Sequence, residues 1–388
     1  MYSNVSTINS THLPQELIIE ILSYLPAINL WPLRYVSKFW FQLLTSDHRF
    51  IKLHLNRSIQ LNNINPSILA SRLEAEKINP SPNFYLAENY TACDKAIQLE
   101  LPFYENGCNY YKVFGICNGL ICLSLYYDNA VCIWNPVTND YIAPPPLPVS
   151  YEQEYVFGFG FLQGTNEYKV VSIPGMFVDL TDIRSNVSVL TVGVDDWWRT
   201  IEEDFCHRIS PHIKTNQTTP FINGACHWLA SKRNALSFNL IVAFDLKDEV
   251  LQEIQPPNVL RRRGPVQDNV VGELAGLLCV FERKDTNDVH IWVMKEYGVV
   301  SSWIKQFVIG RREVSGMFVK LQPLGLVSNG NIILRKNTKE LILYNIKNKS
   351  ISSLRGFGFN VVVACTYNGS IISPRAIGRV RGAGDITI

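Results

Sequence analysis

Histidines and cysteines gather in one part of the sequence, where they could in principle hold a metal ion. Cys206 and His207, His212, and Cys226 and His227 would supply thiolate and imidazole ligands. Their spacing matches none of the standard zinc patterns. Cys226 and His227 also lie in a stretch with the composition of a β-strand, where adjacent side chains point to opposite faces. We therefore expect no metal ion and no other cofactor, and interpret these residues as core and surface positions.

Two further patterns imitate catalytic motifs. The glycines of Gly158-Phe-Gly160-Phe-Leu-Gln-Gly164 resemble a phosphate-binding loop, but a strand follows them, so the helix N-terminus that would bind an anion is missing. We expect a turn at the end of a strand. The sequence has no GxSxG nucleophile motif, and the pairs Asp195-Asp196 and Glu202-Glu203 lie beside turns, as a solvated rim would. The sequence therefore predicts a chain without a catalytic site.

Tryptophan and arginine clusters could instead bind a partner. Trp197-Trp198 and Trp303 follow turns, so we expect them to pack between repeats, with exposure on a partner-binding face as the alternative. The basic run Arg261-Arg262-Arg263 is too short to indicate a nucleic-acid patch. A net charge of +2 over 388 residues gives no electrostatic reason to expect nucleic acid or a membrane as a partner.

Apolar residues at helical spacing fill the stretch from Leu13 to Leu55. Pro14 suits the first turn of a helix, and Pro26 ends that helix. Pro32 is compatible with a second helix only if that helix begins late, near Leu30. Ser37 and Asp47 are expected N-caps of two further helices. A unit of about forty residues cannot bury so much apolar surface alone, so part of it must face the remaining chain or another protein.

The sequence after Phe84 has the texture of an all-β domain. Short apolar strands alternate with turns rich in Asn, Asp, Gly and Pro. Before it, Ser67 to Lys77 has a helical composition, and Pro80 and Pro82 indicate a domain boundary near residue 80. We therefore expect five parts: a disordered tail over 1–12, a helical module over 13–56, a linker over 57–82, the β domain over 83–377 and a flexible tail over 378–388.

A repeat runs through the β domain. Gly119, Gly224, Gly276 and Gly330 each precede an apolar strand, at intervals of 105, 52 and 54 residues, and the first interval spans about two periods. Within three repeats a tight turn joins the next two strands, from Asn135 to Tyr141, Asp245 to Leu251 and Asn345 to Ile351. A period near fifty is typical of a kelch-type propeller blade. The sequence predicts a propeller of about six blades, with an open β-sandwich as the alternative.

The helical stretch resembles an F-box. The pattern LPxELxxEILxYLP, followed by VSKFWFQLL and RFIKLHL, carries this resemblance, and Trp31-Pro32 departs from the family's usual aliphatic–basic pair. In that family these helices bind a Skp-type adaptor. Carried over residue by residue, the resemblance implies an adaptor-binding surface made of Leu13, Pro14, Leu17, Ile18, Ile21, Leu22, Leu25, Pro26 and Leu30, with Val36 and Trp40 supporting the fold.

The β domain is similar to the F-box-associated domain of plant F-box proteins, including the S-locus group. The stretches GICNGLICL, VCIWNPVTNDY, FINGACHWLA and IVAFDLKDEVLQEI carry this resemblance. It implies the substrate-recognition subunit of a Skp–cullin–F-box ubiquitin ligase, bound through the adaptor to a cullin. The target would be another protein, a ribonuclease if the chain were of the S-locus type. The alternative function is a propeller enzyme or sugar-binding protein with an N-terminal helical oligomerisation unit.

The cysteines and the hydropathy pattern suggest a cellular location. Nine cysteines are scattered through the chain, mostly within apolar strands, which suits a reducing compartment. No signal peptide or long apolar run is visible. We expect a cytoplasmic protein, with the nucleus as the alternative location.

Overall fold

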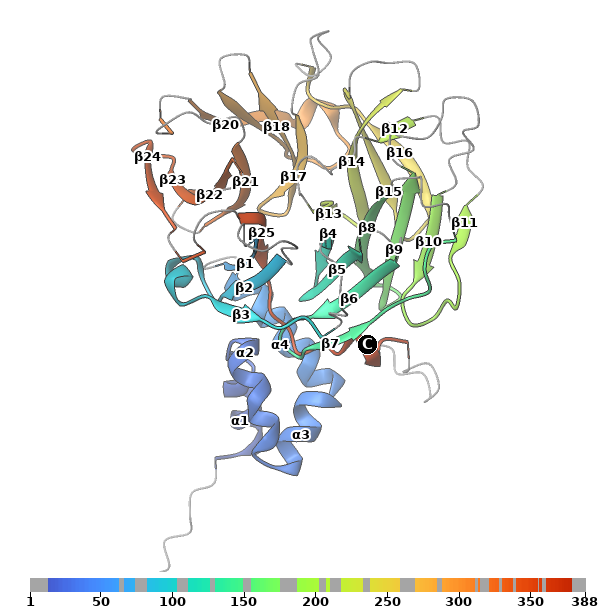
Figure 1. Ribbon diagram of the computed structural model, residues 1–388, viewed down its shortest axis with the longest axis vertical. Helices are drawn as coiled ribbons and strands as arrows, with labels where there is room; N and C mark the ends of the chain where they lie inside the picture. Colours follow the sequence, from blue (N-terminus) through green and yellow to red (C-terminus); the bar gives the residue numbers. More distant parts are fainter. Residues whose placement is uncertain are drawn as a thin grey trace, which may run out of the picture.

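Four-stranded sheets radiate around a central axis, and a small group of helices lies beneath two of them (Figure 1). The computed structural model describes residues 13–62, 66–73, 82–102, 111–125, 130–148, 155–174, 187–201, 207–209, 218–232, 238–258, 269–284, 288–310, 313–314, 321–327, 330–337, 340–354, 356–357 and 361–378. Within these ranges the strands form six sheets, one of which has a fifth short strand. The predicted six-bladed propeller is confirmed.

The helical module consists of α1 (Gln15–Leu22), α2 (Ala27–Leu30), the 3-10 helix η1 (Trp31–Tyr35), α3 (Lys38–Thr45) and α4 (His48–Asn62). Both predicted N-caps are confirmed. The Ser37 hydroxyl accepts a hydrogen bond from the Trp40 amide at 3.2 Å, and the Asp47 carboxylate accepts bonds from the amides of Arg49 and Phe50 at 2.9 and 3.0 Å.

The second helix begins earlier than predicted. It starts at Ala27, directly after Pro26, and ends at Leu30 rather than beginning there. Pro32 falls in the first turn of the following 3-10 helix, where its missing N–H has no helical partner to lose. The chain thus accommodates this proline by dividing the expected helix into two short ones.

Six blades follow the module. The first contains β25 (Val361–Tyr367), β1 (Ser67–Leu73), β2 (Pro82–Ala87) and β3 (Ile97–Leu99). The second contains β4 (Tyr111–Cys117), β5 (Leu120–Leu125), β6 (Ala130–Asn135) and β7 (Asp140–Ile142), and the third contains β8 (Tyr155–Leu162), β9 (Glu167–Pro174), β10 (Val187–Thr191) and β11 (Arg199–Ile201).

The fourth blade contains β12 (His207–Ile209), β13 (Phe221–Ile222), β14 (Ala225–Lys232), β15 (Leu240–Asp245) and β16 (Val250–Ile254). The fifth contains β17 (Val270–Leu274), β18 (Leu277–Arg283), β19 (Val289–Met294) and β20 (Trp303–Ile309), and the sixth contains β21 (Leu321–Leu326), β22 (Asn331–Lys336), β23 (Glu340–Asn345) and β24 (Ser350–Ser353). Three more 3-10 helices are η2 (Tyr90–Lys95), η5 (Val300–Ser302) and η6 (Pro374–Ala376).

The first blade closes the ring by combining both ends of the β domain. Strand β1 pairs antiparallel with β25 on one side and with β2 on the other. The helical composition of Ser67 to Lys77 therefore predicted the wrong element for its first seven residues, because pairing on both edges and burial of Ile68, Leu69 and Ala70 override local propensity. The expected linker over 57–82 likewise contains the end of α4 as well as β1.

The glycine turns lie between the first and second strands of a blade. Each predicted repeat therefore lacked one strand, which precedes the turn: β4 comes before Asn118-Gly119 and β17 comes before Ala275-Gly276. Both residues of these turns have positive φ, at 52° and 77° in the first turn and 53° and 76° in the second. This is the type I′ geometry that suits antiparallel hairpins and favours Asn-Gly.

The predicted tight turns lie between the third and fourth strands. The Asn135 side chain accepts a hydrogen bond from the Val137 amide at 2.9 Å. Asp245 and Asn345 accept equivalent bonds from the amides two residues later, at 2.8 and 3.0 Å. An Asx side chain that bonds its own backbone two residues on begins a turn, so a repeated Asn or Asp sets each of these hairpins.

The glycines that imitate a phosphate loop have a packing role. Gly158 and Gly160 lie inside β8 rather than in a turn, and only Gly164 lies in the turn that follows. A Cβ atom on Gly158 would lie 2.6 Å from the Cys226 sulfur, and one on Gly160 would lie 2.3 Å from the Phe221 ring. These glycines allow the inner strands of the third and fourth blades to approach closely, so the predicted strand-end turn is wrong for both.

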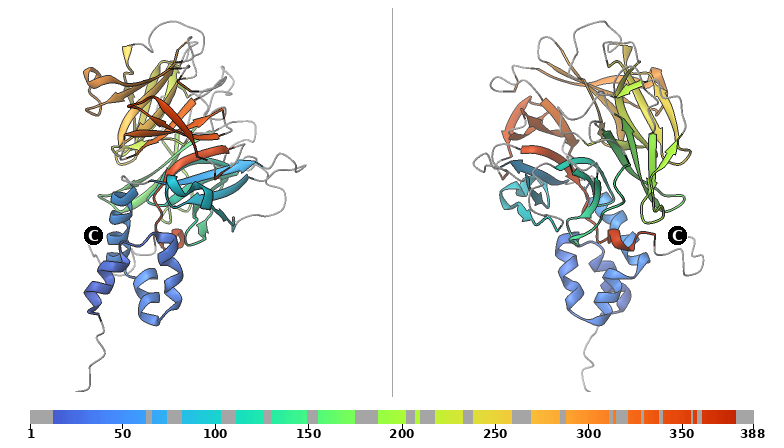
Figure 2. Two further views of the ribbon diagram at one scale, coloured as in Figure 1. Left: turned by 90° about the vertical axis from the view of Figure 1, so that its left-hand side faces the viewer. Right: turned by 45° about the vertical axis from the view of Figure 1, so that its right-hand side comes forward.

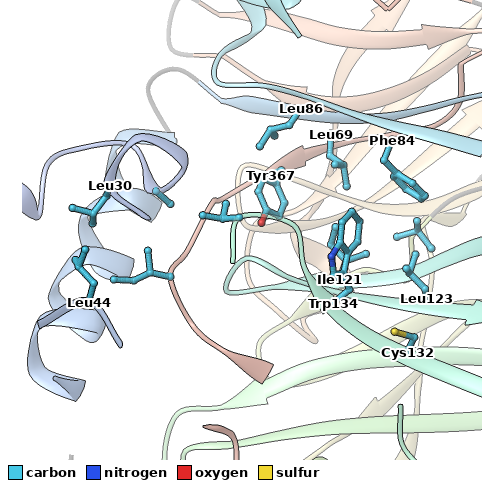
Figure 3. Close-up of a cluster of buried hydrophobic side chains, with 14 of the residues drawn as sticks. Leu30, Leu44, Leu69, Phe84, Leu86, Ile121, Leu123, Cys132, Trp134 and Tyr367 are labelled. Carbon is cyan, nitrogen blue, oxygen red and sulfur yellow. The ribbon is translucent and has the colours of Figure 1, made fainter. Parts of the chain in front are cut away.

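One hydrophobic cluster joins the helical module to the first two blades. Leu30 and Leu44 of the module and Phe84, Trp134 and Tyr367 of the propeller belong to it (Figure 3). Two further views show the module seated against this part of the ring, with the red segment that follows β25 beside it (Figure 2). The module therefore shares its core with the propeller.

Candidate functional site

The outward side of α1 presents an exposed apolar stripe. Leu13, Leu17, Ile21 and Tyr24 are 57%, 48%, 54% and 53% exposed. Leu17 and Ile21 lie one turn apart on one face of α1, and Leu13 and Tyr24 lie just before and just after the helix. Contiguous exposed apolar side chains of this kind mark an interaction surface, so this stripe is the candidate binding site of the module.

The structure divides the eleven predicted adaptor-binding residues by exposure. The exposed ones are Leu13, Pro14, Leu17, Ile21, Pro26 and Val36. Ile18, Leu25 and Trp40 are partly buried, and Leu22 and Leu30 are 4% and 0% exposed. The two buried leucines lie in the shared core, so they support the module without reaching its surface. Val36, predicted to support the fold, is instead 63% exposed.

Four exposed aromatic residues were not among the predicted ones. Tyr24 extends the α1 stripe, and Tyr35, Phe39 and Phe41 lie further along the module. Tyr24 comes three residues after Ile21, so helical spacing alone could have identified it. For Tyr35, Phe39 and Phe41 the sequence holds no such signal, because η1 interrupts the helical period at Trp31.

The α1 stripe is fixed by contacts from α4. The Arg57 guanidinium donates to the Glu20 carbonyl at 3.0 Å and to the Glu20 carboxylate at 2.6 Å, and it lies 4.0 Å from the centre of the Tyr24 ring. His54 is buried beneath the corner between α1 and α2, with Nε2 3.0 Å from the Leu25 carbonyl oxygen. Burial lowers the pKa of His54, while the contact with Leu25 acts in the opposite direction. Burial of the ring therefore favours the neutral imidazole.

The other side of the module docks on the propeller. The side-chain amide of Asn29 donates at 2.9 Å to the carboxylate of Glu88, which directly follows β2. The Ser58 hydroxyl donates to the Gly369 carbonyl at 2.8 Å. Together with the shared core, these bonds fix which side of the module is free, and that side carries the α1 stripe.

The candidate metal ligands that the structure describes do not converge. His227 is buried, and its Nε2 lies 2.8 Å from the Tyr297 hydroxyl, while Cys226 packs in the hydrophobic cluster on the opposite face of β14. His207 pairs with Glu253 at 2.6 Å. Cys206 and His212 lie outside the described residues. Among the described residues, no group of three or more His, Cys, Asp or Glu could hold a metal ion.

Buried tryptophans link neighbouring blades at two equivalent places. The Trp198 indole donates to the Pro145 carbonyl at 2.8 Å, from the third blade to the end of the second. The Trp303 indole donates to the Gln255 carbonyl at 2.9 Å, from the fifth blade to the end of the fourth. Both are 9% exposed, as predicted for packing between repeats, whereas Trp197 is 76% exposed. Trp197 alone of the three fits the alternative of a partner-binding face.

The paired carboxylates have mixed outcomes. Asp195 is not part of a loose solvated rim, since it accepts a bond from the Thr191 amide at 2.7 Å and lies 3.3 Å from the Arg199 guanidinium. Arg199 also pairs with Glu249 of the next blade at 2.8 Å. Glu202-Glu203 and the basic run at Arg261 lie outside the described residues.

The fold and this surface define a class of protein. A small helical module with one face on the propeller and one face free precedes a six-bladed β-propeller. No helix among the described residues is long and apolar enough to span a membrane.

The comparisons with known proteins identify the family. Residues 82–368, more than half of the chain, match the model of the F-box associated beta propeller domain, and residues 10–52 match that of the F-box domain. The chain belongs to the family of F-box proteins with this propeller domain, which confirms the plant F-box resemblance.

Relatives from Arabidopsis thaliana are similar over most of their length. The chain is 27% identical to F-box protein At3g07870 over 369 residues, which cover 86% of this chain and 85% of that protein. It is 27% identical to F-box protein CPR1 over 363 residues, which cover 88% and 84%. Among solved structures, a streptogramin B lyase superposes with a TM-score of 0.39 at 11% identity, over 74% of this chain and 87% of that one, which is too distant to carry an argument.

Proposed function

We propose that this chain is the substrate-recognition subunit of a Skp–cullin–F-box ubiquitin ligase. The α1 stripe would bind a Skp-type adaptor, and through it a cullin, while the propeller binds a target protein for ubiquitination and degradation. The observation that carries the proposal is the free apolar face of an F-box module whose opposite face is seated on the propeller.

The chain would contribute proximity rather than covalent chemistry. Holding a target lysine near a charged conjugating enzyme replaces a bimolecular encounter by an intramolecular one, which raises the effective concentration. A rigid contact between the module and the propeller suits this role. A flexible connection would let the bound target occupy a larger volume and would lower its effective concentration.

The target itself is proposed only as a protein. Membership of the S-locus group, and with it a ribonuclease target, stays a prediction, as does the cytoplasmic and nuclear location. No feature among the described residues favours the alternative of a propeller enzyme or a sugar-binding protein.

Co-purification with a Skp-type adaptor tests the proposal. The double variant Leu17→Asp/Ile21→Asp places two carboxylates in the α1 stripe, and we expect adaptor binding to weaken by at least about a hundredfold, since central apolar contacts contribute about 2 kcal/mol each. The matched control is Ile304→Asp/Val308→Asp on β20, where two apolar side chains of similar exposure, 42% and 43%, lie far from the module.

Three results would decide the outcome. Loss of binding in the α1 variant, with the control binding normally and both variants showing native circular dichroism, supports the proposal. Absence of binding by the wild-type chain contradicts it. If adaptor binding weakens equally in both double variants, the loss is not specific to the α1 stripe, and the α1 stripe is rejected as the adaptor-binding surface.

A further inference from the structure

The C-terminal segment from Asn368 to Gly378 runs along the side of the propeller that carries the helical module. It leaves β25, contacts the second blade and ends beside Gly193 of the third blade. We call this segment the strap. Figure 2 shows its end close to the helices.

The strap is firmly bound to the propeller. Directly before it, at the end of β25, the Tyr367 hydroxyl donates to the Gly119 carbonyl at 2.9 Å. The side-chain amide (Nδ2) of Asn135 donates to the carbonyl oxygens of Ser370 and Ile372 at 2.9 and 2.7 Å. The Ser370 hydroxyl, which is fully buried, donates to the Asn118 carbonyl at 2.7 Å. Buried bonds of this kind hold a segment in one conformation.

The same strap forms part of the seat of the module. Gly369 lies between the anchored residues Tyr367 and Ser370, and its carbonyl accepts the bond from Ser58 of α4. A Cβ atom on Gly369 would lie 3.2 Å from the Cβ of Ala27, at the start of α2. The strap therefore contacts two helices of the module at a point where a larger side chain would push them away.

We propose that Gly369 and Ser370 are positioning residues, which fix the orientation of the helical module relative to the propeller. The inference rests on the proposed function for its biological meaning, because a fixed orientation sets the distance between a bound target and the conjugating enzyme. It places a determinant of F-box orientation more than 300 residues away in sequence, at the opposite end of the chain.

Hydrogen–deuterium exchange on the full chain tests the positioning role without any partner. In Gly369→Val the added methyl groups meet Ala27, so we expect amides of α2 and α4 to exchange about tenfold faster while those of β5 and β6 keep their rates. Ser58→Ala removes one hydrogen bond without a clash, and we expect a smaller change in the same helices. The control is Gly164→Val, since a Cβ at Gly164 has no atom within 4 Å.

The outcomes separate positioning from general destabilisation. Faster exchange confined to the module in Gly369→Val and Ser58→Ala supports the inference. Wild-type exchange in α2 and α4, or an equal increase in β5 and β6, overturns it.

A reconstituted ligase provides the functional readout. We expect the wild-type chain to receive ubiquitin at a restricted set of its own propeller lysines, and Gly369→Val to bind the adaptor equally well but to show a broader set. An unchanged set, mapped by mass spectrometry, would count against the positioning role. A wild-type chain that does not bind the adaptor would overturn the proposed function, while the exchange experiment would still decide the positioning role.

Discussion

The same turn recurs between the first and second strands of several blades. A residue that is poorly suited to this turn in one blade lowers the stability of the protein. Asn118 and Asn223 each occupy the first of the two central positions of a type I′ turn, with φ of 52°. Ala275 occupies the same position in the fifth blade, with φ of 53°. The left-handed region costs an alanine about 1 kcal/mol, whereas asparagine tolerates it.

Replacing Ala275 by the residue found in its equivalents should stabilise the protein. For Ala275→Asn we expect the free energy of unfolding to rise by about 0.5–1 kcal/mol, because the strained conformation becomes a favoured one. Ala275→Val should lower it, since a β-branched residue fits positive φ poorly. Urea denaturation would measure both, and a fall in stability in Ala275→Asn would contradict the argument.

The buried imidazole of His227 should make stability depend on pH. Burial lowers its pKa to about 4 from the ordinary value of 6.5, with bonds to the carbonyls of Pro220 and Ala225 acting in the opposite direction. Between pH 6.5 and about 4, His227 therefore binds a proton in the unfolded chain but not in the folded chain. The contribution of His227 to the free energy of unfolding is fully present above pH 6.5. It falls by about 3 kcal/mol in total as the pH decreases from 6.5 to about 4.

Comparison with a variant isolates this contribution. The fall in the free energy of unfolding between pH 7 and pH 5 should be smaller in His227→Phe than in the wild-type chain, and unchanged in the control His48→Asn, whose histidine is exposed. Identical pH profiles for His227→Phe and the wild type would show that His227 is not the group responsible.

At the scale of elements, adjacent blades are joined by the ends of their strands as well as by apolar faces. Trp198 and Trp303 each donate from one blade to a carbonyl group at the end of the preceding blade. The glycines of β8 allow its backbone to approach β13 and β14. Hydrophobic clusters lie between neighbouring sheets, so each blade is stabilised mainly by its two neighbours.

The two tryptophan links should contribute equally to stability. Trp198→Phe and Trp303→Phe keep an aromatic ring but leave the carbonyl of Pro145 or Gln255 without its donor, so we expect losses of about 1–2 kcal/mol each. Trp197→Phe is the matched control, because its exposed side chain should contribute about zero. Denaturant titrations of the three variants would check this order, and equal effects for Trp197 and Trp198 would refute it.

At the scale of the whole molecule, the helical module and the first two blades of the propeller share one hydrophobic core. Leu22, Leu30, Leu43, Leu44 and Phe50 belong to a cluster that continues into the first two blades. The chain also closes its ring next to the module, because β25 leads into the strap and β1 follows α4. The strands that close the propeller therefore contribute to the core of the module.

The module should not fold by itself. A peptide of residues 13–62 would expose the apolar face that docks on the propeller, and a chain of about fifty residues rarely buries enough surface to compensate for its conformational entropy. We expect weak helical circular dichroism and no cooperative thermal transition. A sharp transition in the isolated peptide would show that the shared core is dispensable.

The sequence by itself determined the features that depend on neighbouring residues. The helix caps at Ser37 and Asp47, the Asn-Gly turns and the fifty-residue period follow from local backbone chemistry, and they were sufficient to predict a helical module and six blades. Trp198 and Trp303 were also correctly predicted to pack between repeats, because a recurring aromatic after each turn is itself a local pattern.

Tertiary structure decided the features that depend on residues far apart in the chain. Ser67–Leu73 became a strand because β25, almost three hundred residues later, pairs with it. Gly158 and Gly160 serve close packing against residues of another blade, which no local pattern reveals. Leu22 and Leu30 look like surface residues of an F-box in the sequence, yet they are buried in the core shared with the propeller. Burial depends on the complete set of neighbours in space, and the order of residues along the chain specifies only a few of them.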